Sequence, residues 1–305
     1  MAKRRSLLDL EHLSTDEITG LLRLARRMQS GRPRPLLRNQ RIALLFYESS
    51  TRTRVSFEFA AKALGATTSI ITSAASSIEK GESLLDTGYT LRALGADLIV
   101  MRHPSSGAPH VLARHLDIPV VNAGDGLHEH PSQGLLDAFT ILRHKKNLKG
   151  LRVAIVGDIF HSRVARSAVQ VLTKFGAKVC LCGPPELCPE MASTLVKGRS
   201  SVSVSRHLEP AIRGVDVIMM LRIQKERLAG LNLDLPAYIS HYRLTAERLR
   251  IAKRDAIVMH PGPIMRGLEI AGDVADGPQS VITEQVHNGV AVRTAILAWC
   301  LGVAK

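Results

Sequence analysis

Aromatic residues are scarce in this 305-residue chain, and long apolar runs are missing. Aromatic residues make up only 4% of the sequence, with a single tryptophan, which leaves little to build the stacking surfaces that hold nucleic-acid bases. No apolar stretch approaches the roughly 18 residues that span a bilayer. The N-terminus is basic, but Asp9 and Glu11 follow too soon for a signal peptide. We therefore expect a cytoplasmic protein that binds neither membranes nor nucleic acid.

Cysteine is also rare, with only Cys180, Cys182, Cys188 and Cys300 in the chain. These residues form no C-x-x-C pair and no His/Cys set with zinc spacing. Cys180 and Cys182 alternate within an apolar run that is typical of a strand, so they would share one face. We expect reduced thiols, no metal ion and no cofactor.

Positive charge, by contrast, is abundant. The formal net charge is +14, and residues 1–41 hold ten Lys or Arg against four Asp or Glu. Three of these basic residues, Arg23, Arg26 and Arg27, fall at helical spacing in a pattern at 15–30, whose apolar stripe includes Leu21 and Ala25. A solvated helix face explains them better than a nucleic-acid surface does, and anionic substrates could account for part of the remaining charge.

Short apolar runs alternate with helical patterns along the chain. We expect strands at 41–48, 69–74, 96–103, 118–124, 151–159, 178–184, 215–221 and 256–262. Further helices are expected at 53–64, 82–94, 109–115, 133–144, 163–175 and 284–301. Continuous Val/Ile/Leu runs between amphipathic helices are typical of parallel sheets that are covered on both faces. The sequence therefore predicts the α/β class, with two doubly wound domains that are each a mostly parallel sheet between layers of helices.

A polar, basic segment at 143–150 separates two such patterns. We expect residues 1–132 and 288–305 to form one domain and residues 133–287 the other, with the helix at 133–144 linking them. Polar residues cluster where the predicted strands end, and ligands of open α/β sheets bind beyond the carboxyl ends of the strands. The active site is therefore expected in the cleft between the two domains.

The segment ESSTRTRVSFE (48–58) follows a predicted strand and opens a helix. It places Ser50, Thr51, Arg52 and Thr53 in consecutive positions. A helix N-terminus offers free N–H groups and a partial positive charge to an anion, and hydroxyl and guanidinium groups add further donors. Simple capping of the helix needs only one hydroxyl, and the spacing of a Walker loop is absent. The segment therefore predicts a phosphate site.

Seven segments together carry a resemblance to an enzyme family: FYESSTRTRVSFEFAAKALGA, KGESLLDT, VMRHP, NAGDGLHEHPSQGLLDAFTI, VGDIFHSRVARS, LRIQKERL and HPGPIMRGLEI. Their order and spacing resemble those of the catalytic chains of the aspartate carbamoyltransferase family, from about residue 5 to the C-terminus. The resemblance implies transfer of a carbamoyl group from carbamoyl phosphate to L-aspartate, which gives N-carbamoyl-L-aspartate and phosphate in pyrimidine biosynthesis. It implies direct attack through a tetrahedral intermediate, with no covalent enzyme intermediate.

The resemblance also assigns roles to residues at matching positions. Carbamoyl phosphate would be bound by Ser50, Thr51, Arg52, Thr53, Arg102, His130, Gln133, Pro261 and Gly262. Aspartate would be bound by Lys80, Arg163, Arg222 and Gln224. The residues expected to act directly in catalysis are Arg52, Thr53, Lys80, Arg102 and His130.

By the same resemblance, Lys80 and a loop serine would reach into the active site of a neighbouring subunit. The serine is either Ser76 or Ser77. This sharing of sites implies a homotrimer. Trimers of the family also occur with a regulatory chain or with dihydroorotase, and this sequence identifies no such partner.

Two alternatives remain beside this interpretation, and the first is an ornithine or another amino-acid carbamoyltransferase of the same fold. Ornithine carbamoyltransferases share the fold and the S-T-R-T-R segment, but they usually carry an H-C-L-P turn and an acidic element for ornithine, whereas this chain has HPGP and the basic LRIQKERL. An inactive or nucleic-acid-binding relative is the less favoured alternative, because no predicted binding position is lost. Residues 224–244 are our candidate for a mobile segment that closes over aspartate.

Overall fold

The computed structural model describes residues 4–31, 35–72, 81–194, 201–224 and 233–303. The chain forms two compact units, which we call unit 1 (Met1–Phe139 with His287–Lys305) and unit 2 (Thr140–Val286). The division falls inside helix α5 (Pro131–His144) and inside helix α11 (Ile282–Cys300). The functional domains expected from the sequence, divided after residues 132 and 287, stay a prediction.

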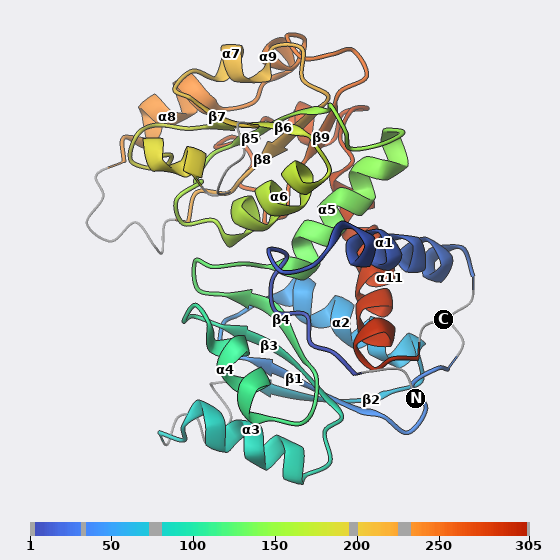
Figure 1. Ribbon diagram of the computed structural model, residues 1–305. Helices are drawn as coiled ribbons and strands as arrows, with labels where there is room; N and C mark the ends of the chain where they lie inside the picture. The colour runs from blue at the N-terminus through green and yellow to red at the C-terminus, as the bar shows by residue number, and fades with distance from the viewer. Residues whose placement is uncertain (1–3, 32–34, 73–80, 195–200, 225–232, 304–305) are drawn as a thin grey trace. The chain divides into compact units, whose positions relative to one another are not determined.

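Unit 1 is built on a four-stranded parallel sheet with the strand order β2-β1-β3-β4 (Figure 1). Its strands are β1 (Arg41–Phe46), β2 (Thr67–Thr72), β3 (Leu98–His103) and β4 (Val120–Asp125). Its helices, besides its parts of α5 and α11, are α1 (Thr15–Ser30), α2 (Thr51–Ala63), α3 (Leu84–Ala93) and α4 (Ala108–His115).

Both faces of this sheet are covered by helices, as the apolar strand sequences predict. Leu45 and Met101 belong to the core cluster on the side of α3 and α4, together with Leu112 of α4. Helix α2 covers the other face, with Phe57 and Ala60 buried (Figure 1). Since β1 and β3 are buried on both faces, they can be formed only from nearly continuous apolar residues.

Unit 2 is built on a five-stranded parallel sheet with the strand order β7-β6-β5-β8-β9. Its strands are β5 (Arg152–Val156), β6 (Lys178–Cys182), β7 (Val202–Ser205), β8 (Val217–Met220) and β9 (Ile257–Met259). Its further helices are α6 (Arg163–Lys174), the 3₁₀ helix η3 (Glu190–Thr194), α7 (Leu208–Ile212), α8 (Leu235–Tyr242), α9 (Ala246–Leu249) and α10 (Gly272–Ala275).

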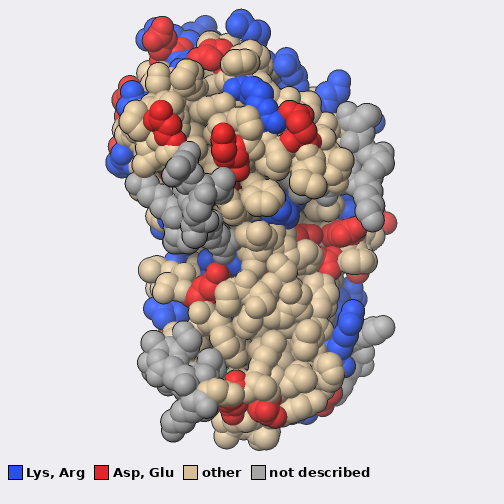
Figure 2. Space-filling model, turned by 90° about the vertical axis from the view of Figure 1, so that its left-hand side faces the viewer, with Lys and Arg blue, Asp and Glu red and all other residues tan. Residues whose placement is uncertain are grey.

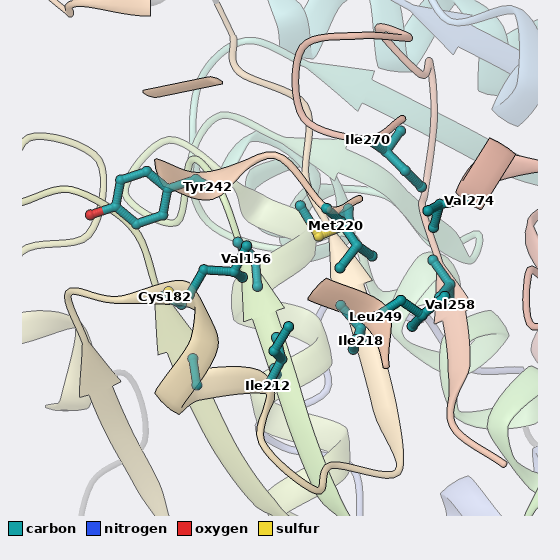
Figure 3. Packing of buried hydrophobic residues seen from close by; sticks show 14 of the residues in the cluster. Val156, Cys182, Ile212, Ile218, Met220, Tyr242, Leu249, Val258, Ile270 and Val274 are labelled. Carbon is teal, nitrogen blue, oxygen red and sulfur yellow. The ribbon is translucent and has the colours of Figure 1, made fainter. Parts of the chain in front are cut away.

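The core of unit 2 lies between this sheet and the short helices that follow its later strands. Figure 3 shows Val156 and Ile218, from two neighbouring strands, beside Ile212 of α7 and Leu249 of α9. Burial of apolar area at about 25 cal/mol per Å² is the main favourable contribution to such packing. Helix α6 carries the other large buried apolar face of the unit.

The predicted α/β class with two parallel, helix-covered sheets is confirmed. The sequence missed β7 and the short helices α7 to α10, because elements of four to eight residues are too short to show a clear periodicity. Helix α2 begins at Thr51, two residues before the predicted start, so Thr51 and Arg52 lie in its first turn. Part of the expected mobile segment, residues 225–232, lies outside the described residues, and α8 forms within the remainder.

The four cysteines are free, and Cys182, Cys188 and Cys300 are buried. Burial raises the pKa of the Cys188 thiol to about 11, so this group is protonated at neutral pH. In the described part of the chain, no helix combines the length and the apolar character that crossing a membrane requires.

Candidate active site

Each sheet has one point where the chain leaves neighbouring strands toward opposite edges. In unit 1 these strands are β1, which leads to β2, and β3, which leads to β4. In unit 2 they are β5, which leads to β6, and β8, which leads to β9. The loops diverge there and leave a crevice beyond the carboxyl ends of the strands, which is where open α/β sheets bind ligands. Of the predicted site residues, the segment 50–53 follows β1, Arg102 lies near the end of β3, Arg163 follows β5, and Arg222 and Gln224 follow β8, whereas His130 and Gln133 follow β4 and Pro261 and Gly262 follow β9.

The N-terminus of α2 is the first candidate binding element in unit 1. Ser50 occupies the N-cap position, but its side chain makes no capping hydrogen bond, and the first turn contains no acidic residue. The N–H groups of Thr51, Arg52 and Thr53 belong to the first turn, where no intrahelical carbonyl is available to them. Exposed Thr51 and Arg52 side chains stand beside these donors. The arrangement suits a doubly charged oxyanion.

Thr53 and His130 come together although 77 residues separate them. Both are buried, and the Thr53 hydroxyl lies 3.4 Å from His130 Nε2. On the other side of the ring, the Ser132 hydroxyl lies 3.3 Å from His130 Nδ1. His130 directly precedes α5, so the strand-end loop and the helix start fix its position. Two neighbouring polar groups thus orient the imidazole toward the start of α2.

Gln133 lies in the first turn of α5 and is oriented by a buried charge pair. Its side-chain amide donates a 2.9 Å hydrogen bond to Asp137, which leaves its carbonyl oxygen to accept from a ligand N–H. Asp137 interacts in turn with Arg293, whose guanidinium lies 5.3 Å from the centre of the Phe57 ring. Burial lowers the pKa of Arg293 to about 10, and Asp137 opposes this shift, so Arg293 stays charged at neutral pH.

Arg102 ends β3 beside the end of β1. It is paired with Phe46 in the parallel register, so its side chain lies close to the loop that leads to α2. Arg102 Nε lies 3.2 Å from a carboxylate oxygen of Glu48, and both side chains are about four-fifths buried. This ion pair holds the guanidinium at the carboxyl end of the sheet.

In unit 2, Asp158 is the centre of the polar cluster at the ends of β5 and β8. Its fully buried carboxylate accepts hydrogen bonds from the backbone N–H of His161 at 3.1 Å and of Gln224 at 3.3 Å. His161 Nδ1 lies 2.9 Å from the same carboxylate. Gln224 donates from its side chain to the His161 carbonyl at 3.0 Å. Asp158 thereby ties the loop after β5 to the loop after β8.

Gly157 allows this close approach of the two loops. Its φ of 128° lies in a region that residues with a side chain rarely adopt. A Cβ atom at this position would lie 2.6 Å from the Leu221 carbonyl oxygen. Arg163 starts α6 and is only 6% exposed, while Arg222 is half-buried directly after Leu221. Unit 2 therefore carries one arginine at the start of the helix that follows β5 and another just after β8, the two strands at its switch point.

The HPGP turn after β9 is fixed by a buried histidine. His260 Nδ1 accepts a 2.8 Å hydrogen bond from the Gly262 N–H, so Nε2 carries the ring proton and donates to Glu269 at 3.0 Å. Glu269 also accepts from the Met265 N–H, and His260 and Glu269 are both fully buried. This network sets the backbone of Pro261 and Gly262, whose carbonyls are the predicted acceptors.

Models of one enzyme family match nearly the whole chain. Residues 5–143 match the carbamoyl-phosphate binding domain of aspartate/ornithine carbamoyltransferases, and residues 149–300 match the Asp/Orn binding domain. The chain belongs to the aspartate/ornithine carbamoyltransferase family. The suspected family is thereby confirmed.

Relatives in this carbamoyltransferase family include two bacterial aspartate carbamoyltransferase catalytic subunits. That of Koribacter versatilis is 62% identical over 97% of this chain and 96% of its own length, and that of Syntrophobacter fumaroxidans is 54% identical over 97% of both. The aspartate transcarbamoylase of Trypanosoma cruzi, solved with carbamoyl aspartate and phosphate, matches with a TM-score of 0.86 at 32% identity, over 97% and 95% of the two chains. Ornithine carbamoyltransferase from Pyrococcus furiosus matches over the full length of both chains, with a TM-score of 0.88 and 29% identity.

The structure thus brings several predicted carbamoyltransferase residues together within each unit. Thr53, at the end of the segment 50–53, adjoins His130 in unit 1, and Gln224 adjoins His161 in the loop that leads to Arg163 in unit 2. Lys80, Ser76 and Ser77 lie outside the described residues. Sequence reasoning did not assign the partners that orient these groups: Glu48, Asp137, Asp158 and Glu269. Asp158 was the one most readily found from the sequence, because it lies at the end of a predicted strand, where polar site residues cluster.

Proposed function

We propose that this chain transfers the carbamoyl group of carbamoyl phosphate to the amine of L-aspartate, producing N-carbamoyl-L-aspartate and phosphate. The observation that carries the choice of aspartate is the pair of arginines at the switch point of unit 2, Arg163 and Arg222. Two guanidinium groups suit the two carboxylates of aspartate and would repel the cationic side chain of ornithine. The names of the most similar relatives support the same substrate.

Unit 1 would bind carbamoyl phosphate. The first turn of α2 would hold the phosphate through its N–H groups, the hydroxyls of Ser50, Thr51 and Thr53, and the Arg52 guanidinium. Arg102 and His130, together with Thr53, would donate to the carbamoyl oxygen. The Gln133 carbonyl would accept from the carbamoyl NH₂, as would the carbonyls of Pro261 and Gly262 from unit 2.

The reaction would proceed by direct attack of the aspartate amine on the carbamoyl carbon. A C–N bond forms, and negative charge develops on the carbamoyl oxygen, where the donors stabilise the tetrahedral intermediate. The C–O bond to phosphate then breaks, the electron pair leaves with the phosphate, and the phosphate accepts the amine proton. The enzyme contributes orientation and electrostatic stabilisation, with no covalent intermediate.

The remaining assignments concern the assembly of the site. Residues 1–132 and 288–305 would form the carbamoyl-phosphate domain and residues 133–287 the aspartate domain, with the active site in the cleft between them. Arg163, Arg222 and Gln224 would hold aspartate, and residues 224–244 would close over it. Lys80 would come from a neighbouring subunit of a homotrimer, with Ser76 or Ser77 beside it.

Unit 1 has surface suited to such an oligomer. Phe59 of α2, Ile70 of β2 and Leu94 after α3 are 57%, 44% and 70% exposed, and β2 is an edge strand of the sheet. Figure 2 shows a broad area of unit 1 that carries few charged side chains. Exposed apolar groups at a sheet edge are typical of surfaces that another chain covers.

The proposed setting is the cytoplasm and pyrimidine biosynthesis, with a regulatory chain or dihydroorotase as candidate further partners. A nucleic-acid partner is disfavoured despite the net charge of +14. On the face drawn in Figure 2, Lys and Arg are interspersed with Asp and Glu among the described residues, and no continuous basic stripe crosses it.

Carbamoyl transfer to L-aspartate and to L-ornithine, measured in parallel, tests the proposal. We expect product from aspartate only. The Arg52→Ala variant should lose at least about 10²–10³-fold in kcat/KM, as the loss of one oxyanion-binding group does. Lys62→Ala is the matched control, since Lys62 is exposed, lies at the other end of α2 and pairs with Glu58 of the same helix.

Turnover of ornithine would overturn the assignment of the unit 2 arginines. A full rate in Arg52→Ala would overturn the phosphate site. The homotrimer is tested separately, by light scattering and by mixing Arg52→Ala with Lys80→Ala chains. Activity should reappear in the mixed trimers, because some sites would combine the intact Arg52 of a Lys80→Ala chain with the intact Lys80 of a neighbouring Arg52→Ala chain.

A further inference from the structure

A cluster of two histidines and a carboxylate lies in unit 1, in the segments before the predicted catalytic residue His130, and the proposed reaction assigns it no role. One ring nitrogen each of His110 and His128 and one carboxylate oxygen of Asp125 lie within 4.8 Å of one another. His110 is in the first turn of α4, Asp125 ends β4, and His128 is in the loop that leads to α5. All three belong to unit 1, so the cluster is formed within a single compact body.

The carboxylate of the cluster is rigidly held. Asp125 is fully buried and accepts hydrogen bonds from the Gly107 N–H at 2.7 Å, from the Asn122 side chain at 2.8 Å and from the Glu129 N–H at 3.1 Å. His128 Nδ1 lies 3.2 Å from both of its oxygens. The carboxylate is thus oriented by its neighbours before any ligand arrives.

An ion pair between His128 and Asp125 explains only part of the cluster. The ring of His110 lies 5.5 Å from that of His128, and its Nε2 lies 3.0 Å from a carboxylate oxygen of Asp9. Because Asp9 can only accept, Nε2 carries the proton and Nδ1 has a lone pair. Nδ1 is enclosed, yet it has no hydrogen-bond partner among the described residues. An enclosed acceptor without a partner calls for an explanation.

We propose that His110, Asp125 and His128 bind a divalent transition-metal ion of the zinc type. Two imidazole nitrogens and a carboxylate are a ligand set that zinc accepts, and they disfavour magnesium and calcium. Metal–ligand bonds of about 2.0–2.1 Å in tetrahedral geometry place neighbouring ligand atoms about 3.4 Å apart. The His128–Asp125 separation of 3.2 Å already fits, and His128 is partly exposed, so its ring can adjust to the ion while Asp9 holds the ring of His110.

The contact between His110 and Asp9 is the arrangement that metal-binding histidines commonly have. A carboxylate that accepts the proton of one ring nitrogen fixes the tautomer and directs the other nitrogen at the metal. Asp9 is 6% exposed and is itself held by the His12 backbone N–H at 2.8 Å. We therefore assign Nδ1 of His110 as the ligand atom and Asp9 as its positioning residue.

The position of the site suggests what the ion would do. It would connect the start of α4 with the loop between β4 and α5, and that loop ends at His130. Binding would restrain this loop and so stabilise unit 1, without contact with the substrates.

Cobalt(II) is the probe, because its visible absorption reports both binding and tetrahedral geometry. The full chain, without a histidine tag and treated with a chelator, is titrated with Co²⁺ and then with competing Zn²⁺. We expect one equivalent per chain, a loss of roughly 10- to 100-fold in affinity in Asp9→Asn, and a larger loss in His110→Gln and in His128→Gln. His115→Gln is the matched control, since His115 is on the same helix, exposed, and bonded to the Val111 carbonyl.

Absence of Co²⁺ binding to the wild-type chain at submillimolar concentrations would overturn the proposal. Binding that is unchanged in both histidine variants would also overturn it, because the ion would then lie elsewhere. Thermal unfolding with and without Zn²⁺ shows whether each variant folds. The melting temperature should rise with Zn²⁺ only in the wild type and in His115→Gln. Carbamoyl transfer is measured separately on the chelator-treated chain, so that failure of metal binding and failure of the proposed activity can be told apart.

Discussion

The two units present polar groups at the same edge of their sheets in different ways. In unit 1 the phosphate-binding candidates Thr51 and Arg52 are exposed and stand in the first turn of α2. In unit 2 the buried carboxylates of Asp158 and Glu269 hold the segments that carry the binding candidates Gln224, Pro261 and Gly262. We therefore expect the start of α2 to serve binding with little effect on stability, whereas the carboxylates of unit 2 serve both. Substitutions at matching places should reveal this difference.

Glu269→Ala should have the largest effect on stability. It removes the acceptor of the His260 Nε2 proton and of the Met265 N–H, and it leaves buried polar groups without partners. We expect a loss of about 3 kcal/mol in the free energy of unfolding, together with weaker activity, because the HPGP turn would lose its support. Urea unfolding followed by circular dichroism measures it.

The comparison in unit 1 is Arg52→Ala, for which we expect a stability change within about 0.5 kcal/mol, as for other exposed positions. If Glu269→Ala unfolds at the wild-type urea concentration, the distinction between the two units fails.

Arg222→Ala should weaken aspartate binding. A hydrogen bond to a charged group contributes about 1.5–3 kcal/mol, so the KM for aspartate should rise by roughly 10- to 150-fold, while binding of carbamoyl phosphate stays nearly unchanged. Initial rates at saturating carbamoyl phosphate measure the effect. Arg213→Ala is the control, because Arg213 is exposed and precedes β8, whereas Arg222 follows it. An equal rise of KM in both variants would indicate a general charge effect instead of a specific contact.

The smallest and sharpest test compares two serines at helix N-caps. Ser162 accepts a hydrogen bond from the Ala165 N–H at the start of α6, whereas Ser50 makes no such bond at the start of α2. Ser162→Ala should therefore destabilise the protein by about 1 kcal/mol. Ser50→Ala should change stability by a few tenths at most and should instead weaken binding of carbamoyl phosphate. Thermal unfolding and calorimetric titration of the two variants distinguish these outcomes, and the reverse pattern would contradict the assignment.

Whether a feature of the site could be predicted from the sequence depends on the sequence separation of the residues that form it. The start of α2 was predictable because strand, hydroxyls, arginines and helix follow one another within residues 41–63. The partners of those groups were not, since Glu48 meets Arg102 and Asp158 meets Gln224 only after the sheets have formed. The arginines at 163 and 222 needed the family resemblance, because a single arginine after a strand is commonly a surface residue.

The short elements of unit 2 show a second reason. Strand β7 (Val202–Ser205) is four residues long, polar on alternate positions and placed at the sheet edge. Helices α9 and α10 have four residues each, and tertiary packing against the core cluster of Figure 3 decides them more than local preference does. Patterns of this length carry too little periodic signal in a single sequence.

The first turn of α2 has a consequence for the thermodynamics of the whole protein. It has no side-chain cap from Ser50 and holds no acidic residue, so an anion bound there would stabilise the folded state and not the unfolded one. By mass-action linkage, a ligand at 100 times its dissociation constant adds about 2.7 kcal/mol to the free energy of unfolding. Phosphate, the proposed product, would act in the same way as the substrate. The melting temperature of this protein would then depend on the anion of the buffer, and a phosphate-free buffer would give its intrinsic value.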